Sequence, residues 1–292
     1  MDYLSFLLRK KTHQTMPKEI NIHTDYHLYK AAWINARAPH LYSKLTKKEC
    51  GVLLKKGGFM IRNTYDFDTN RETSFWYVIK DNFGGMEELS SNTRNQIRRA
   101  FKTLDIQMID KDILLKQGYD VYTAAFEKYK GNSRIMSRTD YLNMIKQTPS
   151  QYEFWACFDK SNGNLIAYSM NEIVDDTCNY LSMKAVPEYL KTHYPYYGLL
   201  YAMNQYYLEE KKLMYVSDGA RSITEHSNIQ SFLISKFKFR NAYCYLQIKY
   251  KWWLNILLSM LYPFRNQFNF APIKAILNME SMHRKSKQIN LS

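Results

Sequence analysis

The stretch EFWACFDKSNGNLIAYSMNEIVDDTCNYLSMKAV, residues 153–186, decides the fold of this chain. Three runs within it favour β structure: Glu153–Phe158, Leu165–Val174 and Cys178–Val186. Short polar turns separate these runs, at Asn162-Gly163 and at Asp175-Asp176. The stretch therefore predicts a meander of three strands.

The segments after the meander alternate between helix and strand. The sequence predicts a helix, a strand, a second helix and a last strand, at Tyr196–Lys211, Leu213–Ser217, Ser227–Phe237 and Ala242–Tyr250. Together with the meander, this order predicts an α/β (α+β) fold: a mixed, mainly antiparallel sheet flanked by helices.

The segments before the meander fit the same fold class. Ser90–Leu104 is the clearest amphipathic helix, because Ile97, Phe101 and Leu104 form one apolar stripe at three-to-four spacing. A strand and two helices are predicted after it, at Asp105–Ile109, Asp112–Tyr129 and Thr139–Gln147. Earlier strands are predicted at Phe59–Asn63 and Phe75–Lys80, and Asn21–Asn63 as a whole looks like a small α-rich segment.

The composition is that of an ordinary globular protein, with 46% hydrophobic and 23% charged residues in a chain of 292. The four cysteines lack CxxC spacing. Three of them, Cys157, Cys178 and Cys244, lie in apolar strand-like runs, so we expect reduced core residues. Met1–Thr12 has a short apolar run followed by basic residues, which is the reverse of a secretory signal. We therefore expect a cytoplasmic protein.

Positive charge gathers towards the C-terminus. The chain has a net charge of +14, and the residues from Ser231 onward include ten basic residues and one acid, Glu280, a net charge of +9. Such a field suits a polyanion, for example phospholipid headgroups, RNA or a phosphate-bearing substrate. The competing explanation is a general over-use of lysine along the whole chain.

Trp252–Tyr262 is apolar nearly all round and is followed by Pro263. Its eleven residues are too few to cross a bilayer, which takes about 20. With Lys249 and Lys251 before it and Arg265 after it, the segment fits a peripheral position at the inner face of a membrane. The alternative is that it packs against the sheet or forms a homodimer.

The run Ser90–Ala100 (SSNTRNQIRRA) follows a strand and a Gly84-Gly85 turn. It resembles the helix that opens the acyltransferase-like domain of the Fem-type peptidoglycan-bridge peptidyltransferases and their acetyltransferase relatives, which belong to the GNAT superfamily. The later segments Leu199–Leu208, Met214–Gly219 and Phe232–Phe239 agree with this pattern. The resemblance implies three parts: an N-terminal segment at 1–74 that is a degenerate partial GNAT-like unit, a GNAT-like acyltransferase domain at 75–250 and a basic C-terminal helical extension at 251–292.

The resemblance also implies an activity: transfer of an acetyl, acyl or aminoacyl group to an amine of a cell-envelope precursor or surface sugar. CoA-using members of the superfamily have a glycine-rich turn before the long helix, where backbone N–H groups hold the pyrophosphate. The equivalent stretch here, Lys191–Gly198, has a single glycine, Gly198, which is the cofactor-binding candidate. The donor stays open between acyl-CoA (acetyl-CoA) and aminoacyl-tRNA. The alternative to an enzyme is a non-catalytic scaffold that binds RNA or an anionic membrane.

Candidate site residues follow from the same resemblance. Backbone groups of the splayed strand Cys178–Val186 are expected to polarise the donor carbonyl. The catalytic candidates are Glu172, Asp218 and His226. The substrate-binding candidates are Arg94, Arg98, Ser182, His193 and Tyr196. The competing readings are a turn-making residue for Asp218, a solvated strand face for Glu172 and ordinary helix entry for the histidines.

Missing motifs exclude several function classes. The seven histidines are scattered without ligand spacing, so no metal is expected. The sequence contains no GxxxxGK[ST], no GxGxxG and no serine elbow. Their absence argues against NTPase, dinucleotide-binding and hydrolase functions.

Overall fold

The computed structural model describes residues 25–126, 135–221 and 229–289, which form two compact units. The central unit is Phe75–Tyr243. The terminal unit combines the residues up to Ser74 with those from Cys244 onward. The described chain is a mixed α/β fold with mostly antiparallel strands and helices at its C-terminal end, as predicted. The three-part division of the chain stays a prediction.

The central unit is built on six of its strands, which lie in the order β4-β9-β8-β7-β6-β5. Their bounds are β4 Phe75–Lys80, β5 Leu104–Ile109, β6 Tyr152–Asp159, β7 Leu165–Val174, β8 Thr177–Ala185 and β9 Tyr215–Ala220. The pair β8–β9 is parallel and the other pairs are antiparallel. The predicted meander is confirmed as β6, β7 and β8, because each of these strands pairs with the next one along the chain.

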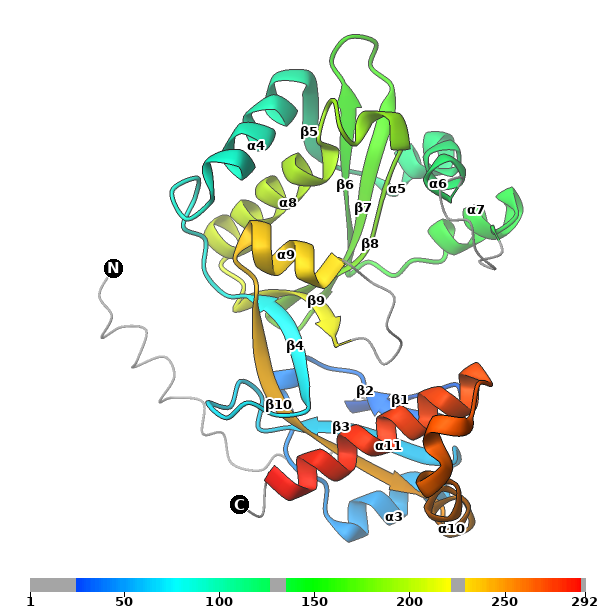
Figure 1. The fold of residues 1–292 in the computed structure, drawn as a ribbon. Helices are drawn as coiled ribbons and strands as arrows, with labels where there is room; N and C mark the ends of the chain where they lie inside the picture. Colours follow the sequence, from blue (N-terminus) through cyan, green and yellow to red (C-terminus); the bar gives the residue numbers. More distant parts are fainter. Residues whose placement is uncertain (1–24, 127–134, 222–228, 290–292) are drawn as a thin grey trace. The chain divides into compact units, whose positions relative to one another are not determined.

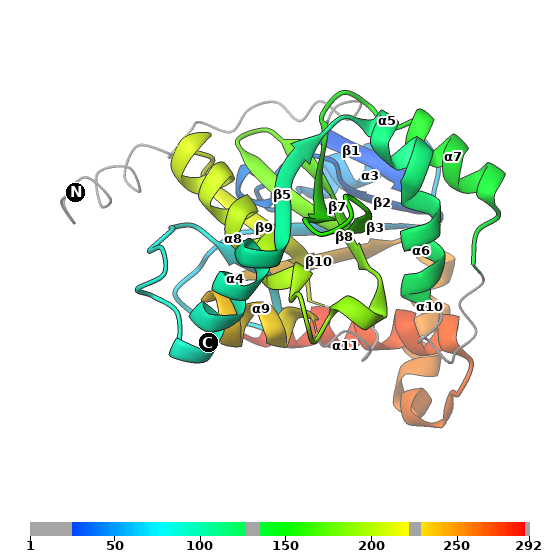
Figure 2. The same ribbon diagram turned by 90° about the horizontal axis from the view of Figure 1, so that it is seen from above.

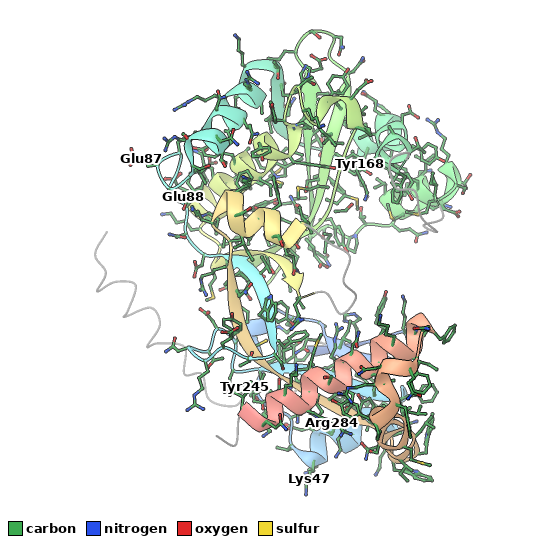
Figure 3. All side chains as sticks on the ribbon, viewed as in Figure 1. Lys47, Glu87, Glu88, Tyr168, Tyr245 and Arg284 are labelled. Carbon is green, nitrogen blue, oxygen red and sulfur yellow. The ribbon has the colours of Figure 1, made fainter. Side chains whose placement is uncertain are left out.

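Helices cover both faces of this sheet (Figures 1 and 2). One face packs against α4 (Ser91–Thr103), α8 (Pro195–Gln205) and α9 (Ile229–Phe237). The other packs against α6 (Tyr119–Phe126) and α7 (Arg138–Lys146), which the short α5 (Lys111–Ile113) precedes. Successive residues of a strand point to opposite faces, so β7 contributes Ala167 to the α8 face and Tyr168, labelled in Figure 3, to the α6 face.

The amphipathic helix forms where the sequence predicts it, with a different buried face. Ser90 caps α4 by accepting a hydrogen bond from the amide of Thr93. Ile97 and Ala100 are fully buried, whereas Phe101 lies at the surface and contacts the ring of Tyr201 edge-on. The prediction was therefore wrong for Phe101, because Ala100 takes its place in the buried stripe. The small side chain of Ala100 lets α8 approach α4 closely.

A buried polar network fixes the C-terminal end of α8 to the sheet. The hydroxyl of Tyr207, in the π-helical turn Tyr206–Glu210, accepts hydrogen bonds from Trp155 Nε1 (3.1 Å) and Asn171 Nδ2 (3.2 Å). In the same region Tyr180 donates to Asn204 Oδ1 at 2.9 Å. These bonds join β6, β7 and β8 to one helix end, so they fix how α8 lies across the meander.

The terminal unit holds the strands β1 (Tyr26–Tyr29), β2 (Ala32–Asn35) and β3 (Met60–Tyr65), and most of β10 (Arg240–Tyr250), in the order β1-β2-β3-β10. Its helix α3 (Lys47–Lys55) buries Leu53 beside Ile61 of β3. The α-rich reading of Asn21–Asn63 was wrong, because β1 and β2 form a hairpin there. Lys30 and Ala31 turn this hairpin with positive φ angles of 45° and 65°, without the glycine or asparagine that marks such turns in a sequence.

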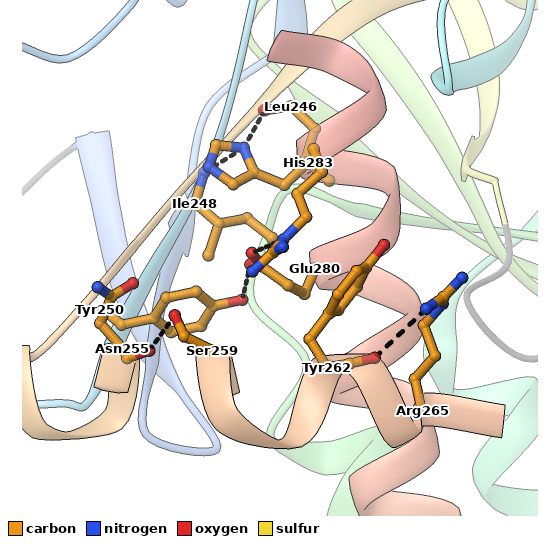
Figure 4. A network of polar contacts seen from close by, with 10 residues as sticks. Leu246, Ile248, Tyr250, Asn255, Ser259, Tyr262, Arg265, Glu280 and His283 are labelled. Carbon is orange, nitrogen blue, oxygen red and sulfur yellow. Dashed lines mark hydrogen bonds and ion pairs between the residues drawn. The ribbon is translucent and has the colours of Figure 1, made fainter. Parts of the chain in front are cut away.

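The C-terminal helices are α10 (Trp252–Leu261) and α11 (Ala271–Ile289), joined through a 3-10 segment, Tyr262–Gln267. Figure 4 shows how α11 binds β10. The amides of Leu246 and Ile248 contact Ser286 Oγ and His283 Nδ1, both at 3.3 Å, and Tyr250 donates to Glu280 Oε2 at 3.0 Å. Side chains of α11 thus satisfy a strand edge that would otherwise lie open.

Two further properties of the described chain bear on the sequence predictions. All four cysteines are buried and free, which confirms that they are reduced core residues. Among the described helices, none combines the length and the apolar character that crossing a membrane requires.

We predict that Tyr207→Phe lowers the free energy of unfolding by about 2–3 kcal/mol, because it leaves the buried donors Trp155 Nε1 and Asn171 Nδ2 without their shared acceptor. Urea unfolding measures this loss. The neighbouring Tyr206→Phe is the matched control and should change stability by less than about 0.5 kcal/mol. Equal effects of the two substitutions would show that the network does not hold α8.

Candidate active site

The strands β8 and β9 pair over three residues and then separate. Thr177, Cys178 and Asn179 pair in parallel with Tyr215, Val216 and Ser217. Beyond that point β8 continues to Ala185, and no strand of the described chain pairs with the edge that had faced β9. This edge, Tyr180–Ala185, together with Asp218–Ala220 of β9, is called the β8–β9 opening below. It presents backbone N–H and C=O groups, as the sequence analysis expected of a splayed strand.

A β-bulge shapes the β8 side of the opening. Tyr180 pairs with Asn171 and Ser182 pairs with Met170, so Leu181 is the extra residue. Leu181 is 48% exposed, whereas Tyr180 before it is buried and Ser182 after it is half-buried. A bulge bends the strand and increases its twist, so it turns the β8 edge away from β9 at this point.

Asp218 lies where β9 leaves its partner. Val216 is buried in the core beneath α8, and alternation along the strand puts Asp218 on that same face. Burial raises the pKa of the Asp218 carboxyl from 3.8 to about 6, and a hydrogen bond from the side chain of Gln230 in α9 acts in the opposite direction. A carboxyl that titrates near neutrality at a strand end is suited to accept and release a proton.

The end of β9 also holds a stacked cation. The amide of Arg221 donates to the carbonyl of Trp76 in β4 at 2.9 Å, and the Arg221 guanidinium lies 4.1 Å from the centre of the Trp76 ring. Burial lowers the pKa of Arg221. Gln230 Nε2 donates to the carbonyl of Ala220 at 3.1 Å, so α9 contacts both Asp218 and the residue before Arg221. The C-terminal end of β9 therefore has an acid, Asp218, and is followed by a cation, Arg221, that stacks on an aromatic ring of β4.

Two of the predicted residues lie on the other face of the sheet. Met170 is buried in the α6-face core and pairs with Ser182, and paired residues share a face. Glu172 is two residues further along β7, so it lies on that face as well, opposite Tyr152. The structure therefore separates Glu172 and Ser182 from Asp218, and the two acids do not form one site.

His193 and Tyr196 lie at the start of α8. The Nδ1 atom of His193 is 2.8 Å from Thr192 Oγ1, and its ring contacts that of Tyr189 edge-on, with the ring centres 4.8 Å apart. Tyr196 is half-buried and packs on the core below α8. Another predicted site residue, His226, lies outside the described residues.

The two arginines of α4 that were predicted to bind substrate have different surroundings. Arg94 Nη1 donates to the carbonyl of Leu89 at 2.9 Å, which ties the helix to the segment before it. Arg98 is exposed to solvent. Neither belongs to the set of residues at the β8–β9 opening, so their predicted contact with substrate stays a prediction.

Gly198 has a packing role in the structure, and its assignment to a cofactor stays a prediction. It is buried in α8, and a Cβ there would overlap Ile106 Cδ1 and come within 3.0 Å of Ala100 Cβ. Its amide contacts the carbonyl of Tyr194 at 3.3 Å. Gly198 is therefore needed so that α8 can approach α4 and β5 closely.

The start of α8 does not fit the pyrophosphate of CoA. The amides of Thr192, His193 and Tyr194 all point to one carbonyl, that of Tyr189, at 2.9–3.3 Å, and Pro195 has no N–H. These are the groups that a diphosphate would need at a helix start. Their use within the chain supports the absence of a CoA-type cradle. Among the described residues, no group of three or more metal-binding side chains is found.

Two partners near Asp218 and Arg221 could not be predicted from the sequence. Trp76 was read only as part of a strand, and Gln230 only as part of a helix. The stacking of Arg221 on Trp76 joins residues about 145 positions apart in the sequence, and the hydrogen bond of Gln230 with Asp218 joins residues about 12 apart. No local sequence pattern predicts such contacts, because they depend on how the segments pack.

Comparisons with known proteins place the fold. No protein-family model and no curated protein matches the sequence. Among solved structures, FemX superposes with a TM-score of 0.52 and 11% identity over 78% of this chain and 80% of its own. The C-terminal domain of a putative lysylphosphatidylglycerol synthetase from Agrobacterium fabrum gives a TM-score of 0.51 with 10% identity, over 80% and 82%. L-PGS from Bacillus licheniformis gives 0.50 with 11% identity, over 88% and 85%.

The chain has a GNAT-like, Fem-type fold. The predicted resemblance is thereby confirmed at the level of the fold. Each likeness extends over more than three quarters of the chain, so it includes residues of both units. At 10–11% identity the likeness concerns the backbone alone, and the chemistry has to be argued from the residues at the opening.

We predict that Gly198→Ala destabilises the protein by about 1–3 kcal/mol, because the added methyl group crowds Ala100 and Ile106. Gly51→Ala is the control: Gly51 lies inside α3, and a Cβ there meets nothing within 4 Å. That change should stabilise the protein by about 0.5–1 kcal/mol. Thermal unfolding compares the two, and a neutral Gly198→Ala would refute the close packing of α8.

Asp218→Asn should change the pH dependence of stability. The folded state holds the Asp218 proton more tightly than the unfolded chain, so ionisation between pH 3.8 and about 6 costs the folded state free energy. At pH 8 this cost is complete, and we expect Asp218→Asn to be more stable than the parent by up to about 3 kcal/mol. Below about pH 4 the difference should vanish.

Urea unfolding at pH 4 and pH 8 measures this effect, with Asp112→Asn as the exposed control. The control should show no comparable gain at pH 8. An Asp218→Asn variant that is less stable than the parent at pH 8 would show that the carboxyl is not strained by burial.

Proposed function

We propose that this protein is an acyltransferase that moves an acyl or aminoacyl group to an amine of a cell-envelope precursor or surface sugar, and that the reaction takes place at the β8–β9 opening. The observation that carries the proposal is the position of Asp218, a carboxyl with a pKa of about 6, beside a strand edge without a partner. The fold likeness supports it, because this scaffold occurs in FemX and in a domain of a putative lysylphosphatidylglycerol synthetase.

Acyl transfer to an amine needs three groups. The donor carbonyl has to be polarised, and backbone N–H groups of the β8 edge at Tyr180–Met183 supply donors for the oxygen as negative charge develops on it. The amine has to lose a proton, which Asp218 accepts, since a pKa of about 6 leaves it ionised at pH 7. A new C–N bond forms, the bond from the carbonyl carbon to the leaving group breaks, and Asp218 returns the proton to that group.

We propose an aminoacyl ester, as in aminoacyl-tRNA, as the donor in preference to acyl-CoA. The amides at the start of α8 are already used by the Tyr189 carbonyl, so the pyrophosphate of CoA lacks its usual partners there. The net charge of +9 from Ser231 onward suits a polynucleotide carrier. A structural neighbour named as a lysylphosphatidylglycerol synthetase is in keeping with an aminoacyl group.

The test is a transfer assay with radiolabelled aminoacyl-tRNA as the donor. A lysine-containing peptidoglycan precursor and a glucosamine-bearing sugar serve as acceptors, and labelled product is separated by chromatography. We expect turnover that rises with pH through about 6 and that Asp218→Asn lowers at least ~100-fold. Asp112→Asn, which also removes one carboxylate, should retain the parent rate.

The stability result separates catalysis from folding. Asp218→Asn is expected to be at least as stable as the parent, so a lost rate cannot be attributed to unfolding. An unchanged rate in this variant would contradict the role of Asp218. Transfer from acetyl-CoA with the same dependence on Asp218 would retain the site and overturn the choice of donor.

The second candidate is a non-catalytic scaffold that binds RNA or an anionic membrane. The strong positive charge near the C-terminus favours it, because binding a polyanion needs no catalytic group. In that case neither donor gives product, tRNA affinity falls steeply with salt, and Asp218→Asn leaves that affinity unchanged.

A further inference from the structure

The helix α10 presents an apolar face to solvent. Its exposed large side chains are Trp252, Trp253, Ile256, Leu257 and Met260, and Phe264 and Phe270 follow in the next segments. Trp252 is 76% exposed and Met260 67% exposed. Soluble proteins rarely expose such a continuous group of aromatic and long aliphatic residues without a partner.

The exposed residues form one stripe along the helix. At about 100° per residue, Trp252, Ile256, Met260, Trp253 and Leu257 fall within an arc of roughly 140°. Leu258, which is buried, lies on the opposite side. The helix thus uses one side to attach to the terminal unit and turns the other, wider side outward.

The terminal unit holds this helix firmly in place. Trp253 contacts the ring of Phe59 edge-on at 5.7 Å between centres, and the amide of Lys251 donates to the carbonyl of Phe59 at 2.9 Å. After the helix, the Arg284 guanidinium of α11 lies 3.9 Å from the centre of the Tyr262 ring, and Arg284 also pairs with Glu280. The exposed face therefore belongs to an ordered, anchored helix.

Cations flank the α10 segment along the chain. Lys249 and Lys274 are exposed, and Lys251 and Arg265 are half-buried at the two ends of the α10 segment. No acid occurs between Glu225 and Glu280 in the sequence. Lysines at a helix N-terminus oppose the helix dipole, so Lys249 and Lys251 do not serve the stability of α10.

We infer that α10 and the 3-10 segment Tyr262–Gln267 seat the terminal unit in the interface of an anionic lipid bilayer. Tryptophan, phenylalanine and methionine enter the boundary of headgroups and acyl chains, and the flanking lysines and Arg265 meet the lipid phosphates. The ten residues of α10 span about 15 Å, half the thickness of the hydrocarbon core, so the helix lies in the plane of the interface.

The charge and the apolar residues of α10 favour an anionic bilayer over a second copy of the chain or an RNA as the partner of this face. A second copy of the chain would bring the same cations to the same edge, and like charges oppose that contact. An RNA partner would satisfy the cations but would leave the aliphatic residues Ile256, Leu257 and Met260 in water. An anionic bilayer matches both the apolar stripe and its basic ends. The inference does not depend on the activity of the β8–β9 opening.

Sedimentation with sucrose-loaded vesicles tests this inference on the full chain. We expect binding to vesicles of equal phosphatidylglycerol and phosphatidylcholine at least tenfold tighter than to phosphatidylcholine alone, with loss of binding at high salt. Ile256→Gln/Met260→Gln should weaken binding at least tenfold. The matched control is Ile234→Gln/Met108→Gln, two residues of the central unit that are each 38% exposed, and it should bind like the parent.

A second pair of variants tests the charges. Lys249→Gln/Lys274→Gln should weaken binding to the anionic vesicles several-fold, whereas Lys47→Gln/Lys48→Gln on α3 should have less effect. Equal binding of the parent and of Ile256→Gln/Met260→Gln would overturn the inference. A dimer without lipid that this variant converts to a monomer would overturn it in favour of a second copy. Variant-sensitive tRNA binding without vesicle binding would overturn it in favour of RNA.

Discussion

The short parallel pairing of β8 with β9 is the constraint on which the candidate site depends. Three residue pairs hold the two strands together, and the bulge at Leu181 then bends β8 away. Beyond that point β8 still pairs with β7, but the N–H and C=O groups on the edge that had faced β9 have no strand partner among the described residues. The same divergence leaves Asp218 at the margin of the α8-face core, where partial burial raises its pKa to about 6. One interruption of the strand ladder therefore produces both the carbonyl-binding edge and the proton acceptor.

Rigid surroundings keep this interruption local. The Tyr207 hydroxyl bridges Trp155 and Asn171, and Gly198 lets α8 lie close against α4, so the long helix cannot slide over the strands to fill the opening. The π-helical turn Tyr206–Glu210 places the Tyr207 hydroxyl over β6 and β7. In the terminal unit, α11 closes a strand edge with its side chains: Ser286 and His283 accept hydrogen bonds from amides of β10. Side chains of helices thus determine which strand edges stay open.

Local pattern was enough to predict most of the central unit. Leu165–Val174 and Phe75–Lys80 form strands over the predicted residues, because a turn signal or a change in polarity marks both of their ends. The β1–β2 hairpin was missed, since all four residues of β2 are half-buried and show no alternation. At the candidate site, Asp218 was predicted from its place at a strand end, and its catalytic role stays a proposal. The separation of Asp218 from Glu172 depends on strand register, which a local sequence pattern does not predict. The packing role of Gly198 depends on its contact with Ile106, a residue distant in the sequence.

The most direct test of the central claim is a crystal structure with a stable analogue of the donor end, a 3′-aminoacyl-adenosine joined by an amide bond. We predict that the carbonyl oxygen of the analogue lies within about 3 Å of a backbone N–H between Tyr180 and Met183, on the side of Asp218. An analogue ordered elsewhere, for example in the hollow lined by Tyr119, Met136 and Asp140, would contradict it.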